Sequence, residues 1–145
     1  MKLIRTTFLL LFCATLGLGV ANAADREEKV VYHITDSAVA TQALNNIRNH
    51  LNASPKAKIV VVAHGAGIDF LLEGAKNKNG NPYDIAVQEL SDRDHVEFRS
   101  CNNTLETRKI DKKQVIPEAK IVPSGVAEVA RLQICLLYTS DAADE

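Results

Sequence analysis

Hydrophobic and polar positions along the chain divide it into two kinds of segment. Residues 29–35 and 58–64 are short runs rich in β-branched side chains, and the second is apolar almost throughout. A continuous apolar run of this length predicts a strand covered on both faces. Between them, residues 37–52 carry apolar side chains at three- and four-residue spacing, which predicts an amphipathic helix with Asp36 or Ser37 as its cap. This order predicts a βαβ unit, the building block of parallel sheets.

The same alternation continues through the second half of the chain. Residues 67–75 and 82–91 predict a short helix and a longer one, separated by an asparagine-rich polar loop. Residues 96–100 and 120–122 predict a third and a fourth strand. Alternating strands and helices favour a three-layer α/β/α sandwich with a mostly parallel sheet of four to five strands.

The last predicted helix begins after Ser124 and is expected to turn Val126, Val129 and Ala130 towards the sheet. The pattern then changes, because residues 135–145 show no continuing helical period. The string CLLYTSDAADE matches the translation of a transposase adapter used in preparing DNA libraries. We interpret it as a tail of non-native origin, with a disordered acidic tail as the alternative, and leave it out of the expected fold.

The first residues have the composition of an export signal. Lys2 and Arg5 precede an apolar stretch, and small residues within 21–23 occupy the positions that a signal peptidase reads. The stretch is too short for a membrane-spanning helix, which needs about 20 apolar residues. We therefore predict that residues 1–23 are a cleaved signal peptide. Residues 24–134 would form one periplasmic domain, with no membrane attachment after cleavage.

The charge of this expected domain is balanced. Two of the 17 basic residues lie before residue 24 and three of the 18 acidic residues lie after residue 134, which leaves 15 of each. A balanced charge gives no support for nucleic acid or an anionic membrane surface as a partner.

Polar, glycine and thiol residues gather where the predicted strands end. In open α/β sheets, ligands bind beyond the carboxyl ends of the strands. With Cys13 in the signal and Cys135 in the tail, Cys101 would be the domain's single cysteine, without an internal disulfide. It precedes a predicted helix start, where free N–H groups favour a thiolate. His64, which ends the second strand, could assist as a cation or proton acceptor, so these two residues are the candidate catalytic pair.

Six further strand-end residues are candidates for binding: Gly65, Asn102, Asn103, Thr104, Ser124 and Gly125. Plain structural roles compete with these assignments, since a lone cysteine is often a core residue and His64 could simply end a strand. His33 is expected to be a packing histidine. One cysteine and one histidine make no metal signature, and the HGAG segment lacks the spacing of a phosphate-binding loop, so neither a metal nor a cofactor is predicted.

Four segments of the chain resemble the DsrE/DsrF-like family with its YchN-like fold, in particular its small exported members: KVVYHITD, IVVVAHGAGIDFLL, VEFRSCNNTL and IVPSGVAEVARLQ. The resemblance spans residues 29–133. Its most specific pieces are the C-x-N-T-L segment at 101–105 and the V-P-S-G-V segment at 122–126. It implies a three-layer sandwich around five parallel strands, commonly assembled into trimers or hexamers.

The resemblance also implies a chemistry. In cytoplasmic relatives a cysteine accepts sulfane sulfur as a persulfide and passes it on, which implies a sulfur-carrier role for Cys101, with a sulfur donor or acceptor protein as partner and no cofactor. The chain departs from the relay proteins around this cysteine, and the family's closing strand is expected to be missing. A non-catalytic ligand-binding or assembly module with an incidental cysteine is the alternative. A redox or metal-sensing oligomer, with one cysteine from each protomer, is a third.

Overall fold

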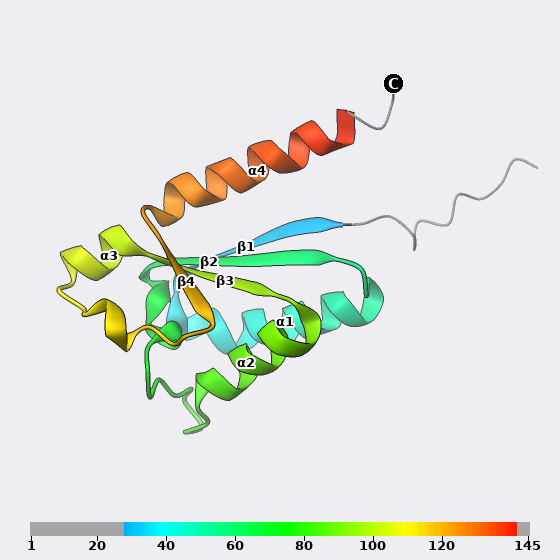
Figure 1. Cartoon of the computed structure of the whole chain (residues 1–145). Helices are drawn as coiled ribbons and strands as arrows, with labels where there is room; N and C mark the ends of the chain where they lie inside the picture. The colour runs from blue at the N-terminus through cyan, green and yellow to red at the C-terminus, as the bar shows by residue number, and fades with distance from the viewer. Residues whose placement is uncertain (1–27, 142–145) are drawn as a thin grey trace, which may run out of the picture.

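The computed structural model describes residues 28–141, which form one parallel sheet with helices on both of its faces (Figure 1). In chain order, with η marking a 3-10 helix, the elements are β1 (Lys29–Asp36), η2 (Ser37–Val39), α1 (Ala40–Ala53), β2 (Lys58–Ala66), η3 (Gly67–Leu71), α2 (Tyr83–Asp94), β3 (Glu97–Cys101), α3 (Asn102–Thr107), η4 (Lys112–Gln114), β4 (Ala119–Val122) and α4 (Gly125–Asp141). The predicted signal peptide and residues 142–145 lie outside the described residues. None of the helices within residues 28–141 is long and apolar enough to cross a membrane.

The four strands lie in the order β1-β2-β3-β4, and each neighbouring pair is parallel. β2 lies inside the sheet, and its Val61, Val62 and Ala63 are fully buried, as expected of a strand covered on both faces. The register sets Val62 beside His33 of β1 and Arg99 of β3, so these three side chains share one face of the sheet. The predicted α/β fold with a parallel sheet is confirmed.

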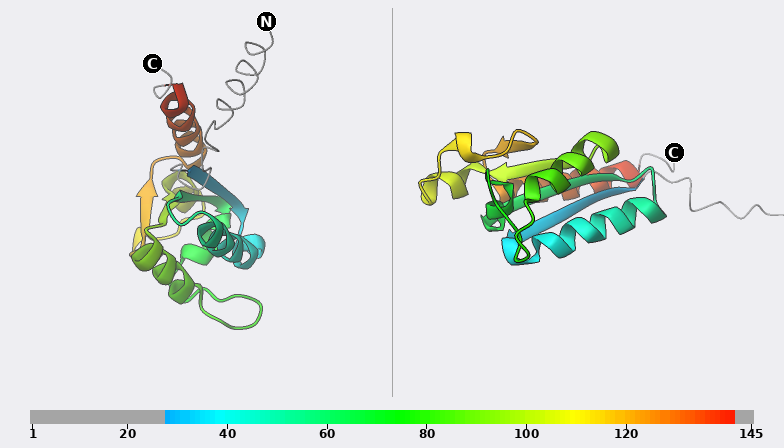
Figure 2. Two further views of the ribbon diagram at one scale, coloured as in Figure 1. Left: turned by 90° about the vertical axis from the view of Figure 1, so that its right-hand side faces the viewer. Right: turned by 90° about the horizontal axis from the view of Figure 1, so that it is seen from below.

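Helices form a layer on each face of the sheet. α1 and α2, together with η3, cover one face, and α4 covers the other, as the two further views show (Figure 2). The buried side chains of α1 and α2 repeat at i, i+4 and i+7. They are Ala40, Leu44 and Ile47 in α1, and Tyr83, Val87 and Leu90 in α2. The three predicted layers are therefore present.

The cap of one predicted helix is confirmed, and another predicted helix is shorter in the structure. The side chain of Asp36 caps η2, as predicted. The helix expected for residues 67–75, in contrast, is a single 3-10 segment that ends at Leu71. Leu72 turns extended and forms an antiparallel bridge with Val115, a residue far along the chain. A long-range contact of this kind leaves no mark in the local spacing of apolar residues.

The face that α4 turns to the sheet also differs from the prediction. Val129 is buried as expected, but Val126 is 61% exposed and Ala130 is exposed as well. The inner face is formed instead by Gly125, Glu128 and Val129. Because one of these is a carboxylate, a reading by hydrophobicity alone assigns the wrong face to the helix.

α4 also runs further than predicted. It continues to Asp141, whereas the helical pattern was expected to stop before residue 135. Residues 135–141 contain neither glycine nor proline, so the backbone has no local reason to leave the helix. The interpretation of this tail as non-native sequence stays a prediction.

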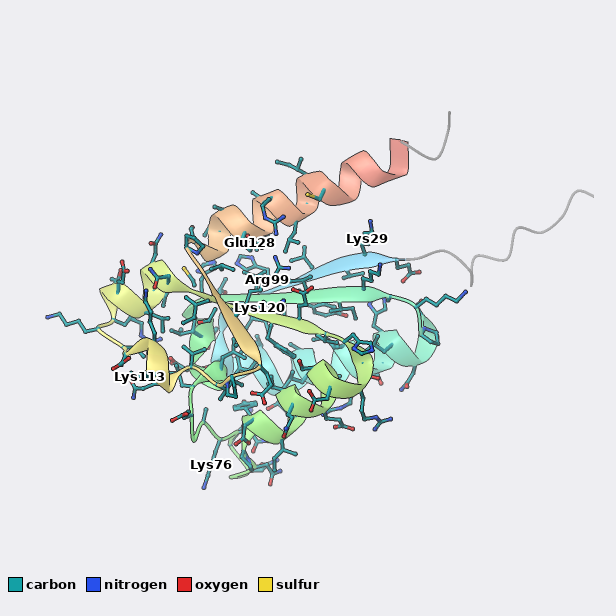
Figure 3. All side chains as sticks on the ribbon, in the orientation of Figure 1. Lys29, Lys76, Arg99, Lys113, Lys120 and Glu128 are labelled. Carbon is teal, nitrogen blue, oxygen red and sulfur yellow. The ribbon has the colours of Figure 1, made fainter. Side chains whose placement is uncertain are left out.

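A partly buried ion pair joins α4 to the sheet. Arg99 of β3 donates from Nη1 to Oε1 of Glu128, and their side chains are only 14% and 12% exposed (Figure 3). Arg99 also donates from Nη2 to Glu97 at 2.8 Å, and Glu128 accepts a second partner, Arg131, at 2.6 Å. Hydrogen bonds from Arg131 lower the pKa of Glu128 below its ordinary value, burial opposes this, and Arg99 lowers it further.

Replacing the buried carboxylate should weaken the fold. We expect Glu128→Gln to reduce the free energy of unfolding by about 2 kcal/mol, between the values for exposed and for fully buried pairs, because Arg99 keeps its charge and is left with Glu97 but not Glu128 as a carboxylate partner. Urea titration at pH 7 measures this difference. Since a lowered pKa stabilises the fold above the ordinary value of 4.5 and that contribution is lost as pH falls through the folded-state pKa, the difference should shrink in acid.

The matched control is Glu89→Gln on α2, where the carboxylate is 42% exposed and pairs with Arg48 and Arg93. Exposed pairs contribute little, so this change should cost less than about 0.5 kcal/mol. Equal losses for the two variants would contradict a special role for the buried pair.

Candidate functional site

Cys101 lies where β3 ends and α3 begins. Its backbone is still extended, with φ −76° and ψ 117°, and α3 starts at the next residue. The predicted position of the thiol, after a strand and before a helix, is confirmed. The residue is only 4% exposed, so whatever reaches the thiol must come through the surface directly above it.

A hollow of about 300 Å³ opens above this thiol. Described residues lining it are His64, Gly65, Cys101, Asn103, Thr104, Thr107, Arg108, Ser124 and Val126. Six of the eight candidate site residues are among them, so β2, β3 and the start of α4 do bring the predicted strand ends together. Gly125 lies behind the hollow against Cys101. Asn102 is not part of the lining, and its side-chain amide donates to Glu106 at 2.7 Å instead.

Hydrogen-bond donors surround the sulfur of Cys101. Burial raises the pKa of the thiol, but hydrogen bonds from the Thr104 hydroxyl and from the backbone N–H groups of Gly125, Thr104 and Asn103 outweigh it, so the pKa lies below its ordinary value. The Asn103 N–H is shared with the carbonyl of Pro123, 3.3 Å away. Donors of this kind stabilise a thiolate, the nucleophilic form of cysteine.

The peptide of Gly65 organises one side of this arrangement. Its N–H donates to Oγ1 of Thr104 at 3.0 Å, which leaves the hydroxyl hydrogen of Thr104 to point at Cys101. Its carbonyl accepts from Nη1 of Arg108 at 3.1 Å, and the same nitrogen donates to Asp69 at 2.6 Å. Gly65 has φ +60°, a left-handed conformation that a side chain would strain. Glycine is therefore the residue that adopts this conformation with least strain.

Gly125 organises the other side. A Cβ atom at this position would lie 2.9 Å from Cβ of His64 and 3.1 Å from Cβ of Cys101, both too close. Only glycine lets the first residue of α4 approach the strand ends and offer its N–H to the sulfur. Ser124 accepts from Ala127 N at 3.4 Å and so caps α4, as predicted.

His64, which lines the hollow beside Cys101, stacks on His33. The rings of His33 and His64 have centroids 4.7 Å apart and are tilted by 35°. Partial burial lowers the pKa of His33, and the charge of His64 lowers it further. His33 was expected to be a packing residue; it is exposed, and its ring is covered in part by His64, a candidate site residue. Within the described residues His64 makes no hydrogen bond to Cys101, so Thr104 and the backbone amides are the groups that favour the thiolate.

Sequence reasoning missed Arg108, Thr107 and Val126 as lining residues. The first two could have been found from helical spacing, because Thr104, Thr107 and Arg108 stand at i, i+3 and i+4 and so share one face of α3. In the part of the chain that the structure describes, no group of three or more His, Cys, Asp or Glu side chains could hold a metal ion.

The chain is similar to a known family and to solved structures. The model of the DsrE/DsrF-like family matches residues 17–134. A solved structure of a protein of unknown function, MTH1491 from Methanobacterium thermoautotrophicum, is similar, with 27% identity and a TM-score of 0.66 over 74% of this chain and 93% of that one. The ychN protein from E. coli has the same fold at 14% identity and a TM-score of 0.62, over 75% and 93%. A search of curated proteins found no match.

Removing the Thr104 hydroxyl should make the thiol less reactive. We expect Thr104→Val to raise the pKa of Cys101 and to slow its alkylation by iodoacetamide at pH 7 by about tenfold, the size of one lost hydrogen bond to a charged group. Rates measured from pH 5 to 10 separate the pKa from intrinsic reactivity. Thr107→Val is the control, since Thr107 lines the same hollow but bonds the carbonyl of Asn103. Equal slowing in both variants would count against the Thr104 contact.

The histidine pair makes a separate prediction. In a nuclear magnetic resonance titration, His33 should titrate below the ordinary value of 6.5, and its pKa should rise in His64→Gln because one of the two causes of its lowering is removed. Because the folded protein resists protonation of His33, stability should fall as pH drops below about 6.5, and less so in His33→Gln. An unchanged His33 pKa in His64→Gln would contradict the coupling.

Proposed function

We propose that this protein, which belongs to the DsrE/DsrF-like family, carries sulfane sulfur as a persulfide on Cys101. The observation that carries the proposal is the set of donors around the sulfur: the hydroxyl of Thr104 and the backbone amides of Thr104 and Gly125 all favour the thiolate. A thiolate at the base of an open hollow is a nucleophile that a small donor can reach. No cofactor takes part in this chemistry.

The transfer consists of two thiolate displacements. In the first, Cys101 Sγ attacks the outer sulfur of a donor persulfide, R–S–SH; a new S–S bond forms, the donor's S–S bond breaks, and R–S⁻ leaves with the bonding electrons. The protein then holds Cys101–S–SH. In the second, an acceptor thiolate attacks the outer sulfur, forms its own persulfide and releases Cys101 as thiolate. Electrons balance in each step without an external oxidant or reductant.

The surroundings of Cys101 favour a carrier over a dithiol oxidoreductase. Thiol–disulfide chemistry within one chain needs a second cysteine near the first, and among the described residues the other thiol, Cys135, is exposed on α4. It borders a separate cavity with Lys29 and Glu97, which begin β1 and β3, whereas Cys101 ends β3. A cysteine hydrolase is also less well supported, because His64 makes no hydrogen bond to Cys101 in this structure.

The proposal extends to the setting in which the protein works. The sequence of residues 1–23 supports export to the periplasm, and a sulfur carrier there requires a donor and an acceptor outside the cytoplasm. The proposal includes assembly into a trimer or hexamer, which rests on the resemblance to the family.

Intact-mass spectrometry tests the carrier directly. After exposure to inorganic polysulfide, the wild-type protein and Cys135→Ser should each gain the mass of one or more sulfur atoms, removed by dithiothreitol, and Cys101→Ser should gain none. Alkylation by iodoacetamide at pH 7 should also be faster at Cys101 than for free cysteine. If Cys101 gains no sulfur and alkylates no faster than free cysteine, the carrier is excluded and a ligand-binding module with an incidental cysteine becomes the better description.

A further inference from the structure

Arg108 lines the hollow, and part of its guanidinium makes no hydrogen bond to the described residues. Its Nη1 donates both to the carbonyl of Gly65 and to Asp69, and these two contacts fix the group in place. Its Nη2 and Nε make no hydrogen bond to any described residue. A guanidinium held by one nitrogen and open at the others is ready to bind a planar or tetrahedral anion through two parallel N–H groups.

The side chains that line the hollow allow an anion to bind. Of the described residues that line it, Arg108 alone has a permanent charge, and none is a carboxylate. The carboxylate that faces Arg108, Asp69, lines a different cavity together with Asp36 and Tyr83. The Cys101 thiolate is negative, but its charge is already met by the Thr104 hydroxyl and by backbone amides. An anion that enters can therefore bind the open Nη2 and Nε groups of Arg108, whose Nη1 is paired with Asp69.

The size of the hollow limits what can enter. A volume of about 300 Å³ is at the lower end for small-molecule sites, and Cys101 beneath it is 4% exposed. A donor of a few heavy atoms can bring its outer sulfur to Sγ, whereas a large one can present only a narrow end.

We propose that Arg108 is the specificity-determining residue of this site and selects small anionic sulfur donors by binding their charged end while the outer sulfur meets Cys101. The inference rests on the proposed carrier function and adds the substrate class to it. The anionic end is common to inorganic thiosulfate and to organic thiosulfonates, and separate experiments with each distinguish these sources.

Thiosulfate illustrates the step. Cys101–S⁻ attacks the outer sulfur of S₂O₃²⁻; the S–S bond of thiosulfate breaks, and SO₃²⁻ leaves with the electron pair, giving Cys101–S–S⁻. Total charge and electron count are the same on both sides. Negative charge grows on the sulfite oxygens as the bond breaks, so a guanidinium on those oxygens stabilises the transition state more than the bound donor.

A purely structural role for Arg108 is the competing account, because its two contacts also brace α3 against the end of β2 and against η3. The two accounts differ in their dependence on charge. If Arg108 only braces α3, its replacement should change the rates of neutral and anionic reagents at Cys101 equally. If Arg108 selects anions, its replacement should slow the anionic reagent alone.

The experiment compares iodoacetate with iodoacetamide, which are both attacked at a CH₂ carbon with iodide as the leaving group and which differ in charge. Thiolate rate constants are measured at Cys101 in wild type, Arg108→Gln, Arg108→Lys and the control Arg93→Gln, an equal charge loss on exposed α2. The iodoacetate-to-iodoacetamide ratio should fall about tenfold in Arg108→Gln, the effect of one lost charge-assisted contact. It should fall less, by about threefold, in Arg108→Lys, which keeps the charge but loses the two parallel N–H groups. Circular dichroism confirms that each variant is folded.

Sulfur transfer gives the second measurement. Persulfide formation from thiosulfate and from methanethiosulfonate, followed by mass, should slow about tenfold in Arg108→Gln and not in Arg93→Gln. If only one donor loads the protein, it identifies the source. An unchanged reagent ratio and unchanged loading in Arg108→Gln overturn the role of Arg108 and leave the carrier intact. If wild type gains no sulfur from polysulfide or from either donor, the carrier fails, and the reagent ratio alone then decides whether Arg108 selects anions.

Discussion

The close approach of α4 to the ends of β2 and β3 is the constraint on which the site depends. At Gly125 the helix comes so near that a Cβ atom would meet the Cβ atoms of both His64 and Cys101. This approach supplies an N–H donor to the sulfur, forms the back wall of the hollow and buries the thiol. One helical turn further on, Glu128 meets Arg99 of β3, so the same packing that seats the first residue of α4 is secured by an ion pair. The surroundings of Cys101 therefore depend on how α4 packs against the sheet.

The order of strands and helices could be predicted because local pattern and tertiary environment agree. Apolar β-branched runs such as the one in β2 are buried in the sheet, and the i, i+4, i+7 stripes of α1 and α2 face the core. The predictions failed where a distant residue decides the outcome. Leu72 is extended and forms a bridge with Val115 instead of continuing a helix. α4 turns Glu128 inward because Arg99 lies on the facing side of the sheet. Neither partner is visible from within the segment concerned.

The candidate site residues were likewise predicted where their signal is local and missed where it depends on distant residues. Cys101 and Thr104 were found because a thiol at a strand end followed by polar residues has a local signature. Arg108 was missed because a basic residue after a short helix is ordinarily a surface charge, and its value comes from Gly65 and Asp69, which lie about 40 positions earlier in the chain. His33 was missed because its contact with His64 depends on the register between two strands. Sequence spacing therefore reveals a thiol at a strand end sooner than the side chains that distant segments bring beside it.

The donors around Cys101 are placed for a sulfur bonded directly to Cβ. A second sulfur extends the side chain by one S–S bond of about 2 Å, and the negative charge of the persulfide then lies on that outer atom. Loading would thus move the charge away from the amides of Gly125 and Thr104 and towards the hollow above the thiol. On the proposed carrier function, the unloaded thiolate lies at the base of the hollow and the outer sulfur of the persulfide lies further out, so one added atom would distinguish the two states to a partner without any movement of the backbone.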